Sequence, residues 1–142
     1  MIYTKLTKKA LLISFSTHKE QKDKSGMPYV YHPFHLAEQM DDEASVCVAL
    51  LHDVAEDTEM TLDDIKGEGF PEEVTDALAL MTHDDIVPYL DYVKKLKHNP
   101  IARKVKLADL MHNSDLSRLD TVDEKALERV EKYKKAIDIL NE

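Results

Sequence analysis

A histidine and an aspartate stand side by side within an apolar run of the sequence. The pair is His52-Asp53, and apolar side chains flank it on both sides. Ionisable groups in such surroundings are unfavourable to bury unless a partner compensates them. A metal ion compensates an imidazole and a carboxylate together, so the pair predicts a metal site.

Two distant groups can complete this site. His32 lies just before Pro33, and Asp109 lies in a second apolar run far downstream. Side chains from three separated segments can enclose one ion, which adjacent residues alone cannot do. We therefore predict His32, His52, Asp53 and Asp109 as ligands of a divalent ion. Imidazole and carboxylate donors together suit manganese, iron or zinc.

Two carboxylates directly follow the pair. On the helix predicted here, Glu56 lies four residues after His52, and Asp57 lies four residues after Asp53. A water bound to a metal ion becomes a nucleophile near neutral pH. Glu56 or Asp57 can orient that water or accept its proton. The alternative is that both are solvated charges at a helix end.

The elements that must position these residues are predicted to be helices. Apolar residues recur at helical spacing along most of the chain, and the residues before each run are typical helix starts. The predicted helices are 4–18, one from Pro33, a central one over 43–55, a short one from Thr61, one from Pro71, one near 89–96, one from Pro100, and one from Thr121 or Asp123 to about Leu140. The fold class is all-α, a compact helical bundle.

Composition bounds the remaining possibilities. The 142 residues suit one domain, over residues 1–142, and 43% of them are hydrophobic, which is enough for a core. The net charge of −9 argues against nucleic-acid and membrane surfaces as partners. The single cysteine, Cys47, lies in an apolar segment and is predicted to be a buried thiol. We expect a cytoplasmic protein, and the oligomeric state stays open.

Four stretches together resemble the HD-domain phosphohydrolases, and more narrowly the hydrolase domain of the RelA/SpoT alarmone enzymes and their small stand-alone relatives. In family order they are His18-Lys-Glu-Gln21, Lys24-Ser25-Gly26-Met-Pro28-Tyr29-Val-Tyr-His32-Pro33, Leu50-Leu51-His52-Asp53-Val54-Ala-Glu56-Asp57-Thr58, and Val105-Lys106-Leu107-Ala108-Asp109-Leu-Met-His112-Asn113. The resemblance implies a helical bundle of the HD-domain type.

The resemblance also implies an activity and roles for residues. It implies a small nucleotide as substrate, with release of pyrophosphate from the ribose 3′ position of guanosine tetra- and pentaphosphate. The metal it implies is manganese, held by the four predicted ligands, with Glu56 and Asp57 acting on the attacking water as the catalytic pair. The residues it implies for substrate binding are Lys24, Ser25, Tyr29, Lys106 and Asn113. Tyr29 either stacks on a base or packs the loop, and His18 and His112 either support the ligands or contact substrate.

Three departures from the family pattern keep alternatives open. Asp23 stands where the family has an arginine, Leu110 follows the metal aspartate where arginine is common, and the segment 82–100 is short. A second hypothesis is therefore an HD phosphohydrolase acting on another nucleotide or nucleotide cofactor. A third is a non-catalytic nucleotide sensor, against which the presence of both Glu56 and Asp57 argues.

Overall fold

The chain is helical throughout, as predicted. The computed structural model describes residues 1–142 and contains α-helices, one 3₁₀ turn and no β-strand. The elements are α1 (Lys5–His18), α2 (Tyr31–Glu38), α3 (Glu43–Leu51), α4 (Val54–Asp57), α5 (Leu62–Gly67), α6 (Glu72–Met81), α7 (Tyr89–Leu96), α8 (Pro100–Asn113), η1 (Leu116–Arg118) and α9 (Glu124–Asn141).

Short polar side chains start most of these helices. The Thr61 hydroxyl accepts from the Asp64 backbone N–H at 3.1 Å, and Asp64 reciprocates at 2.9 Å, which forms a capping box for α5. Asp123 caps α9 through the Ala126 N–H. Asn99 caps α8, and Pro100 occupies its first turn, where a missing N–H does no harm.

Helix α3 forms the centre of the bundle. All of residues 45–51 are buried, and α3 packs against α1, α2, α6 and α8. A helix that is apolar on every side requires neighbours all round it. The buried Cys47 belongs to this core, and burial raises the pKa of its thiol to about 12. The thiol is therefore inert at neutral pH, as the sequence suggested.

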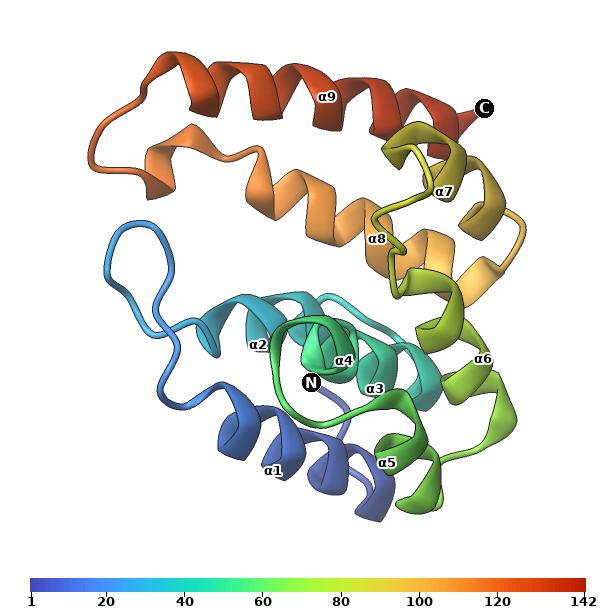
Figure 1. Cartoon of the computed structure of the whole chain (residues 1–142). Coiled ribbons are helices and arrows are strands. Elements are labelled where there is room, and N and C mark those ends of the chain that lie inside the picture. Colours follow the sequence, from blue (N-terminus) through green and yellow to red (C-terminus); the bar gives the residue numbers. More distant parts are fainter.

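The remaining helices lie in two groups around this centre. Helices α8 and α9 run along one side, whereas α1 to α5 form the other, and α6 and α7 connect the two groups (Figure 1). Helix α9 packs on α7 and α8, on the side of the molecule opposite α1 (Figure 1). The loop between α1 and α2 contacts the turn between α8 and α9, since the Ser25 hydroxyl donates to the Arg118 carbonyl at 2.7 Å, and the two segments lie side by side in Figure 1.

The prediction of one continuous helix over 43–55 is wrong. Helix α3 ends at Leu51, a turn follows at His52-Asp53, and α4 begins at Val54. The His52 ring donates from Nδ1 to the Ala49 carbonyl at 2.7 Å, and Asp53 has φ −101° and ψ −1°. These values lie outside the α-helical region, in the sparsely populated bridge region. The turn therefore changes the direction of the chain at the residues predicted to bind metal.

Candidate metal centre

The four predicted ligands meet at one point in the interior. Each of His32, His52, Asp53 and Asp109 offers a ligand atom, and these atoms all lie within 4.8 Å of one another. The closest approaches are 2.9 Å between His32 Nε2 and Asp109 Oδ1 and 3.0 Å between His52 Nε2 and Asp53 Oδ2. The group joins the start of α2, the α3–α4 turn and the last part of α8.

The protonation of His52 tests whether a cation fits this group. Because Nδ1 donates to the Ala49 carbonyl, a neutral His52 presents the Nε2 lone pair to the cluster, where the nearby Asp53 Oδ2, at 3.0 Å, has no hydrogen to donate to it. Burial alone would lower the pKa of His52, but Asp53 and Asp109 raise it well above its usual value. A positive charge beside Nε2 is therefore favoured, and the donor set of the cluster suits a divalent metal ion.

Neighbouring side chains orient the candidate ligands. The Nδ1 atoms of His32 and His112 lie 2.7 Å apart, and the two stacked rings have their centroids 5.0 Å apart. Asn113 donates to Asp109 Oδ1 at 3.0 Å, and the Tyr29 hydroxyl donates to Asp53 Oδ2. Such contacts fix ring tautomers and carboxylate directions around a metal ion. His112 thus contacts a candidate ligand.

Lys106 forms an ion pair with one member of the cluster, Asp109. Its Nζ lies 2.9 Å from Asp109 Oδ2, and it sits over the rings of Tyr89 and Tyr92 at 5.7 and 5.6 Å from their centroids. Burial would lower the pKa of Lys106, but Asp109 and the two tyrosines raise it well above its usual value. The ammonium group therefore orders Asp109, one helical turn away on α8.

The two predicted catalytic carboxylates lie beside the cluster on α4, and both are exposed. Glu56 accepts a hydrogen bond from the His83 backbone N–H. Although the residues are exposed overall, partial burial of the carboxylates raises the pKa of Glu56 and of Asp57, and the nearby Asp53 charge raises both further. For Glu56 these effects outweigh the His83 N–H, which lowers its pKa. A carboxylate with a raised pKa is a stronger base, which suits proton transfer from water.

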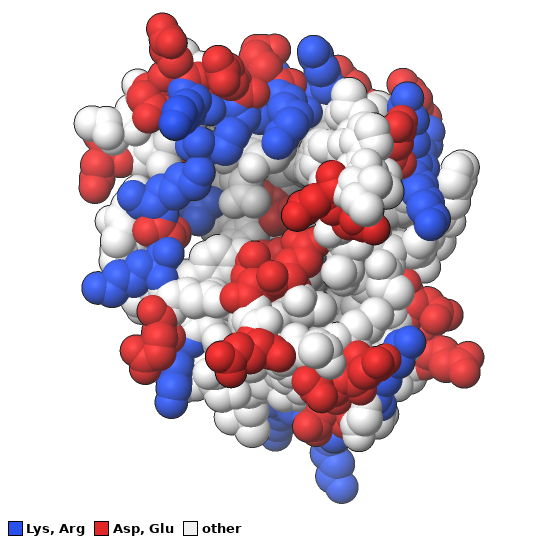
Figure 2. Space-filling view, viewed as in Figure 1, with Lys and Arg blue, Asp and Glu red and all other residues white.

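A polar cavity of about 110 Å³ adjoins the cluster through Asn113, which lines the cavity and donates a hydrogen bond to Asp109. Three basic side chains line it, and so do three predicted or possible substrate contacts; the full lining is Asp23, Lys24, Ser25, Asn113, Arg118, Leu119, Arg129 and Tyr133. Figure 2 shows a hollow between the two groups of helices, with basic side chains along one rim and acidic ones along the other. The cavity suits an anionic ligand.

The sequence pattern did not identify three of the residues that line this cavity: Arg118, Arg129 and Tyr133. Arg118 follows α8 in the 3₁₀ turn η1, and it lies 3.8 Å from Asp23 through Nη2. Arg129 and Tyr133 are four residues apart on α9, so they share one face. That spacing was the available signal, but arginine on an amphipathic helix usually marks a solvated face.

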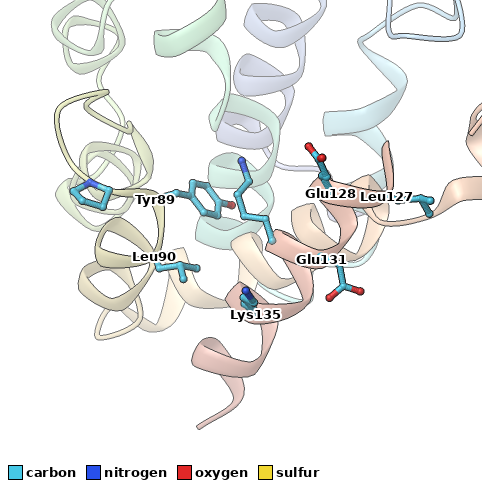
Figure 3. Close-up of a pocket in the computed structure, with 8 residues that line it drawn as sticks. Tyr89, Leu90, Leu127, Glu128, Glu131 and Lys135 are labelled. Atoms are coloured by element: carbon cyan, nitrogen blue, oxygen red, sulfur yellow. The ribbon is translucent and has the colours of Figure 1, made fainter. Parts of the chain in front are cut away.

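A larger hollow of about 580 Å³ lies between α7 and α9. Tyr89 and Leu90 contribute from α7, whereas Leu127, Glu131 and Lys135 contribute from α9 (Figure 3). None of the candidate ligands or catalytic carboxylates lines it. It is therefore separate from the metal centre, although Tyr89 also lies beneath Lys106.

No helix in the chain combines the length and apolarity needed to cross a bilayer.

Known proteins resemble the chain in sequence. No family model matches it. The guanosine-3′,5′-bis(diphosphate) 3′-pyrophosphohydrolase MESH1 of Mus musculus is 36% identical over 120 residues, which cover 73% of this chain and 66% of that protein. The protein of the same name from Xenopus tropicalis is 32% identical over 130 residues, which cover 82% of this chain and 72% of that one. The chain thus spans just under two thirds of the mouse relative.

A solved structure resembles the chain in fold. It aligns with a TM-score of 0.77 at 23% identity and covers 99% of this chain and 88% of its own; its title is "A metazoan ortholog of SpoT hydrolyzes ppGpp and plays a role in starvation responses". At this identity the likeness establishes the fold. The predicted all-α bundle of the HD-domain type is thereby confirmed.

Proposed function

Because this chain belongs to the family of the guanosine-3′,5′-bis(diphosphate) 3′-pyrophosphohydrolases, we propose that it hydrolyses the 3′-diphosphate of a guanosine nucleotide and releases pyrophosphate. The observation that carries the proposal is the cluster of His32, His52, Asp53 and Asp109, with its ligand atoms within 4.8 Å. The polar cavity that Asn113 helps to line, called the Asn113 cavity below, lies beside this cluster. Its basic side chains, Lys24, Arg118 and Arg129, favour a nucleotide. The reaction class is therefore metal-assisted hydrolysis of a phosphate anhydride or ester.

The cofactor in this proposal is manganese. His32, His52, Asp53 and Asp109 would hold it, and their mixture of imidazole and carboxylate donors supports an ion of intermediate hardness. When bound, the ion supplies Lewis acidity toward a phosphoryl oxygen and lowers the pKa of water. His112 and Tyr29 keep a ring and a carboxylate of this set in fixed directions.

In this proposal Glu56 and Asp57 orient the attacking water and accept its proton. Glu56 keeps one carboxylate oxygen on the His83 N–H, which leaves the other oxygen available to a water. Asp57 makes no side-chain hydrogen bond within the protein and faces solvent. Their raised pKa values support the acceptance of a proton from water during its attack on phosphorus.

The substrate contacts in this proposal come from both groups of helices. Lys24 and Ser25 approach from the loop before α2, and Asn113 approaches from α8. Arg129 adds a guanidinium from α9, which suits phosphate because its donors match two oxygens at once. Tyr29 and Lys106, also predicted as substrate contacts, do not line the Asn113 cavity, and they bond to Asp53 and Asp109. We assign these two to ordering the metal ligands.

A second candidate is hydrolysis of a different nucleotide at the same cluster. Asp23 stands where the family has an arginine, and its Oδ2 lies 3.8 Å from Arg118 Nη2. A carboxylate at this edge of the cavity changes which donors a nucleobase can satisfy. This observation favours a test across several bases rather than guanine alone.

The proposal is tested by turnover of purified protein loaded with manganese. Guanosine tetraphosphate, adenosine tetraphosphate with the same 3′- and 5′-diphosphates, and NADPH are offered separately, and released phosphate and pyrophosphate are measured. We expect the guanosine compound to react fastest, and Asp53→Ala to abolish both bound metal and turnover. A metal-loaded protein that turns over only another nucleotide would establish the second candidate. Full activity of Asp53→Ala would contradict the metal centre.

A further inference from the structure

His18 has a buried position that the proposed chemistry does not use. It is the last residue of α1, its side chain is fully buried, and it lies outside the group of metal ligands. Its Nδ1 lies 2.7 Å from Gln21 Oε1, whereas its Nε2 has no hydrogen-bond partner. A buried polar ring normally has partners for both nitrogens, so this arrangement calls for an explanation.

Gln21 connects His18 to the candidate catalytic pair. Its Nε2 donates to the backbone carbonyl of Asp57 at 2.6 Å. This contact fixes the orientation of the amide, so Oε1 must accept the hydrogen bond from His18. The Nδ1 atom of His18 therefore carries a proton, whether the ring is neutral or charged. The result is a directed chain of hydrogen bonds from His18 through Gln21 to Asp57.

The His18 ring also supports the other side of the site. It packs against the Tyr29 ring, with centroids 5.1 Å apart. The Tyr29 hydroxyl in turn donates to Asp53 Oδ2. One buried side chain thus acts on a candidate metal ligand through Tyr29 and on a candidate catalytic residue through Gln21.

Helix α4 needs such support at its end. It comprises only Val54–Asp57, and the side chain of Asp53 makes no capping hydrogen bond at its start. Short helices are marginal without tertiary contacts. Gln21 itself is held firmly, because its N–H donates to the His18 carbonyl at 2.9 Å and its carbonyl accepts from the Tyr29 N–H at 2.9 Å. It is therefore a rigid anchor for the backbone of Asp57.

We propose that His18 and Gln21 are positioning residues that hold the Asp57 main chain, and hence its carboxylate, beside the metal centre. The proposal rests on the function proposed above for Asp57. It predicts an effect on the chemical step, since neither residue lines the Asn113 cavity. A misplaced catalytic group lowers the rate even when substrate still binds.

Gln21→Met is the kinetic test, because it keeps the side-chain length and removes both hydrogen bonds. We expect kcat to fall about 10- to 100-fold while KM and manganese affinity change less than about threefold. Gln21→Glu should be impaired to a similar extent, since a carboxylate still accepts from His18 but cannot donate to the Asp57 carbonyl. Glu20→Met is the matched control, because Glu20 is the exposed neighbour in the same segment. Unchanged kcat in both Gln21 variants would overturn the proposal.

A second measurement does not depend on activity. Nitrogen-15 NMR of the metal-free protein reports which ring nitrogen of His18 carries the proton. We expect the Nδ1–H form in the wild type and a loss of that preference in Gln21→Met. An Nε2–H form in the wild type would overturn the hydrogen-bond chain. If the wild type does not hydrolyse guanosine tetraphosphate, the proposed function fails, and the NMR result alone decides whether the His18–Gln21 link exists.

Discussion

At the scale of single residues, Tyr29 joins the loop before α2 to the candidate metal centre. Its hydroxyl donates to Asp53 Oδ2, and its ring packs against both His18 and His32. Burial, followed by the charge of Asp53, raises the pKa of the phenol far above its usual value. The hydroxyl therefore stays protonated and remains a donor to Asp53 at every physiological pH.

Tyr29→Phe removes this donor and keeps the ring. We expect manganese affinity to fall about tenfold or more, because a ligand carboxylate loses the contact that fixes its direction. Isothermal titration with manganese measures the change. Tyr31→Phe is the control, since it removes the same hydroxyl from an exposed side chain in the same segment. Equal affinity in the two variants would show that the Tyr29 hydroxyl does not order the site.

The grouping of the ligands was predictable from residue types, whereas several neighbours were not. His32, His52, Asp53 and Asp109 are ionisable residues next to or within apolar segments, which is an unusual and readable pattern. Arg118 looks like an ordinary surface residue in the sequence, and Gln21 stands there only within the stretch His18-Lys-Glu-Gln21, with no role assigned to it. Their significance arises from contacts with distant segments, at Asp23 and at Asp57. No local pattern contains those contacts.

At the scale of elements, the starts of the helices were predicted better than their ends. The caps at Thr61 and Asp123 are short-range features, and the structure has both. The break after Leu51 was missed because it involves a side chain bonding to its own helix, at the Ala49 carbonyl. Apolar periodicity continues through the break, so the sequence pattern gives no indication of the break.

The Asp42 cap tests how α3 is held at its start. Asp42 accepts from the Ser45 N–H at 2.8 Å, and Asp42→Ala should lower the free energy of unfolding by about 1 kcal/mol. Asp42→Asn is the control, since asparagine caps nearly as well. Urea unfolding at pH 7 measures both. Equal stability of wild type and Asp42→Ala would contradict the assigned cap.

The pH dependence of this effect has a definite sign. Burial would raise the pKa of Asp42, but hydrogen bonds from Ser45 and Lys104 outweigh it and lower the pKa. A depressed folded-state pKa stabilises the protein above the unfolded-state pKa, which is about 3.9, and this contribution is lost as the pH falls further. The difference in stability between wild type and Asp42→Ala should therefore shrink below about pH 4.

At the scale of the whole molecule, the charges are distributed unevenly. The chain carries a net charge of −9, yet basic side chains gather on one rim of the central hollow (Figure 2). Arg118 and Arg129 come from segments after α8, whereas Lys24 comes from the loop before α2. Packing α8 and α9 over the earlier helices thus creates a local positive region in an acidic protein. This region gives an anionic substrate a favoured place to bind.

Arg129→Met tests this arrangement. We expect KM for guanosine tetraphosphate to rise about tenfold with kcat nearly unchanged, because a charge-assisted hydrogen bond to phosphate is lost. Steady-state kinetics at constant ionic strength measures it. Lys134→Met removes the same charge from an exposed position on α9 and should leave KM unaltered. A similar rise in both variants would point to net charge rather than to the cavity.

Following the fate of each phosphorus atom decides whether the chain hydrolyses the 3′-diphosphate of a guanosine nucleotide. Phosphorus-31 NMR of guanosine tetraphosphate with the manganese-loaded protein distinguishes the 3′- and 5′-diphosphates. We predict loss of the 3′ signals, equal appearance of GDP and pyrophosphate, and complete inhibition by a chelator. Release from the 5′ side, release of single phosphates, or no reaction with bound metal verified in the same sample would contradict the account.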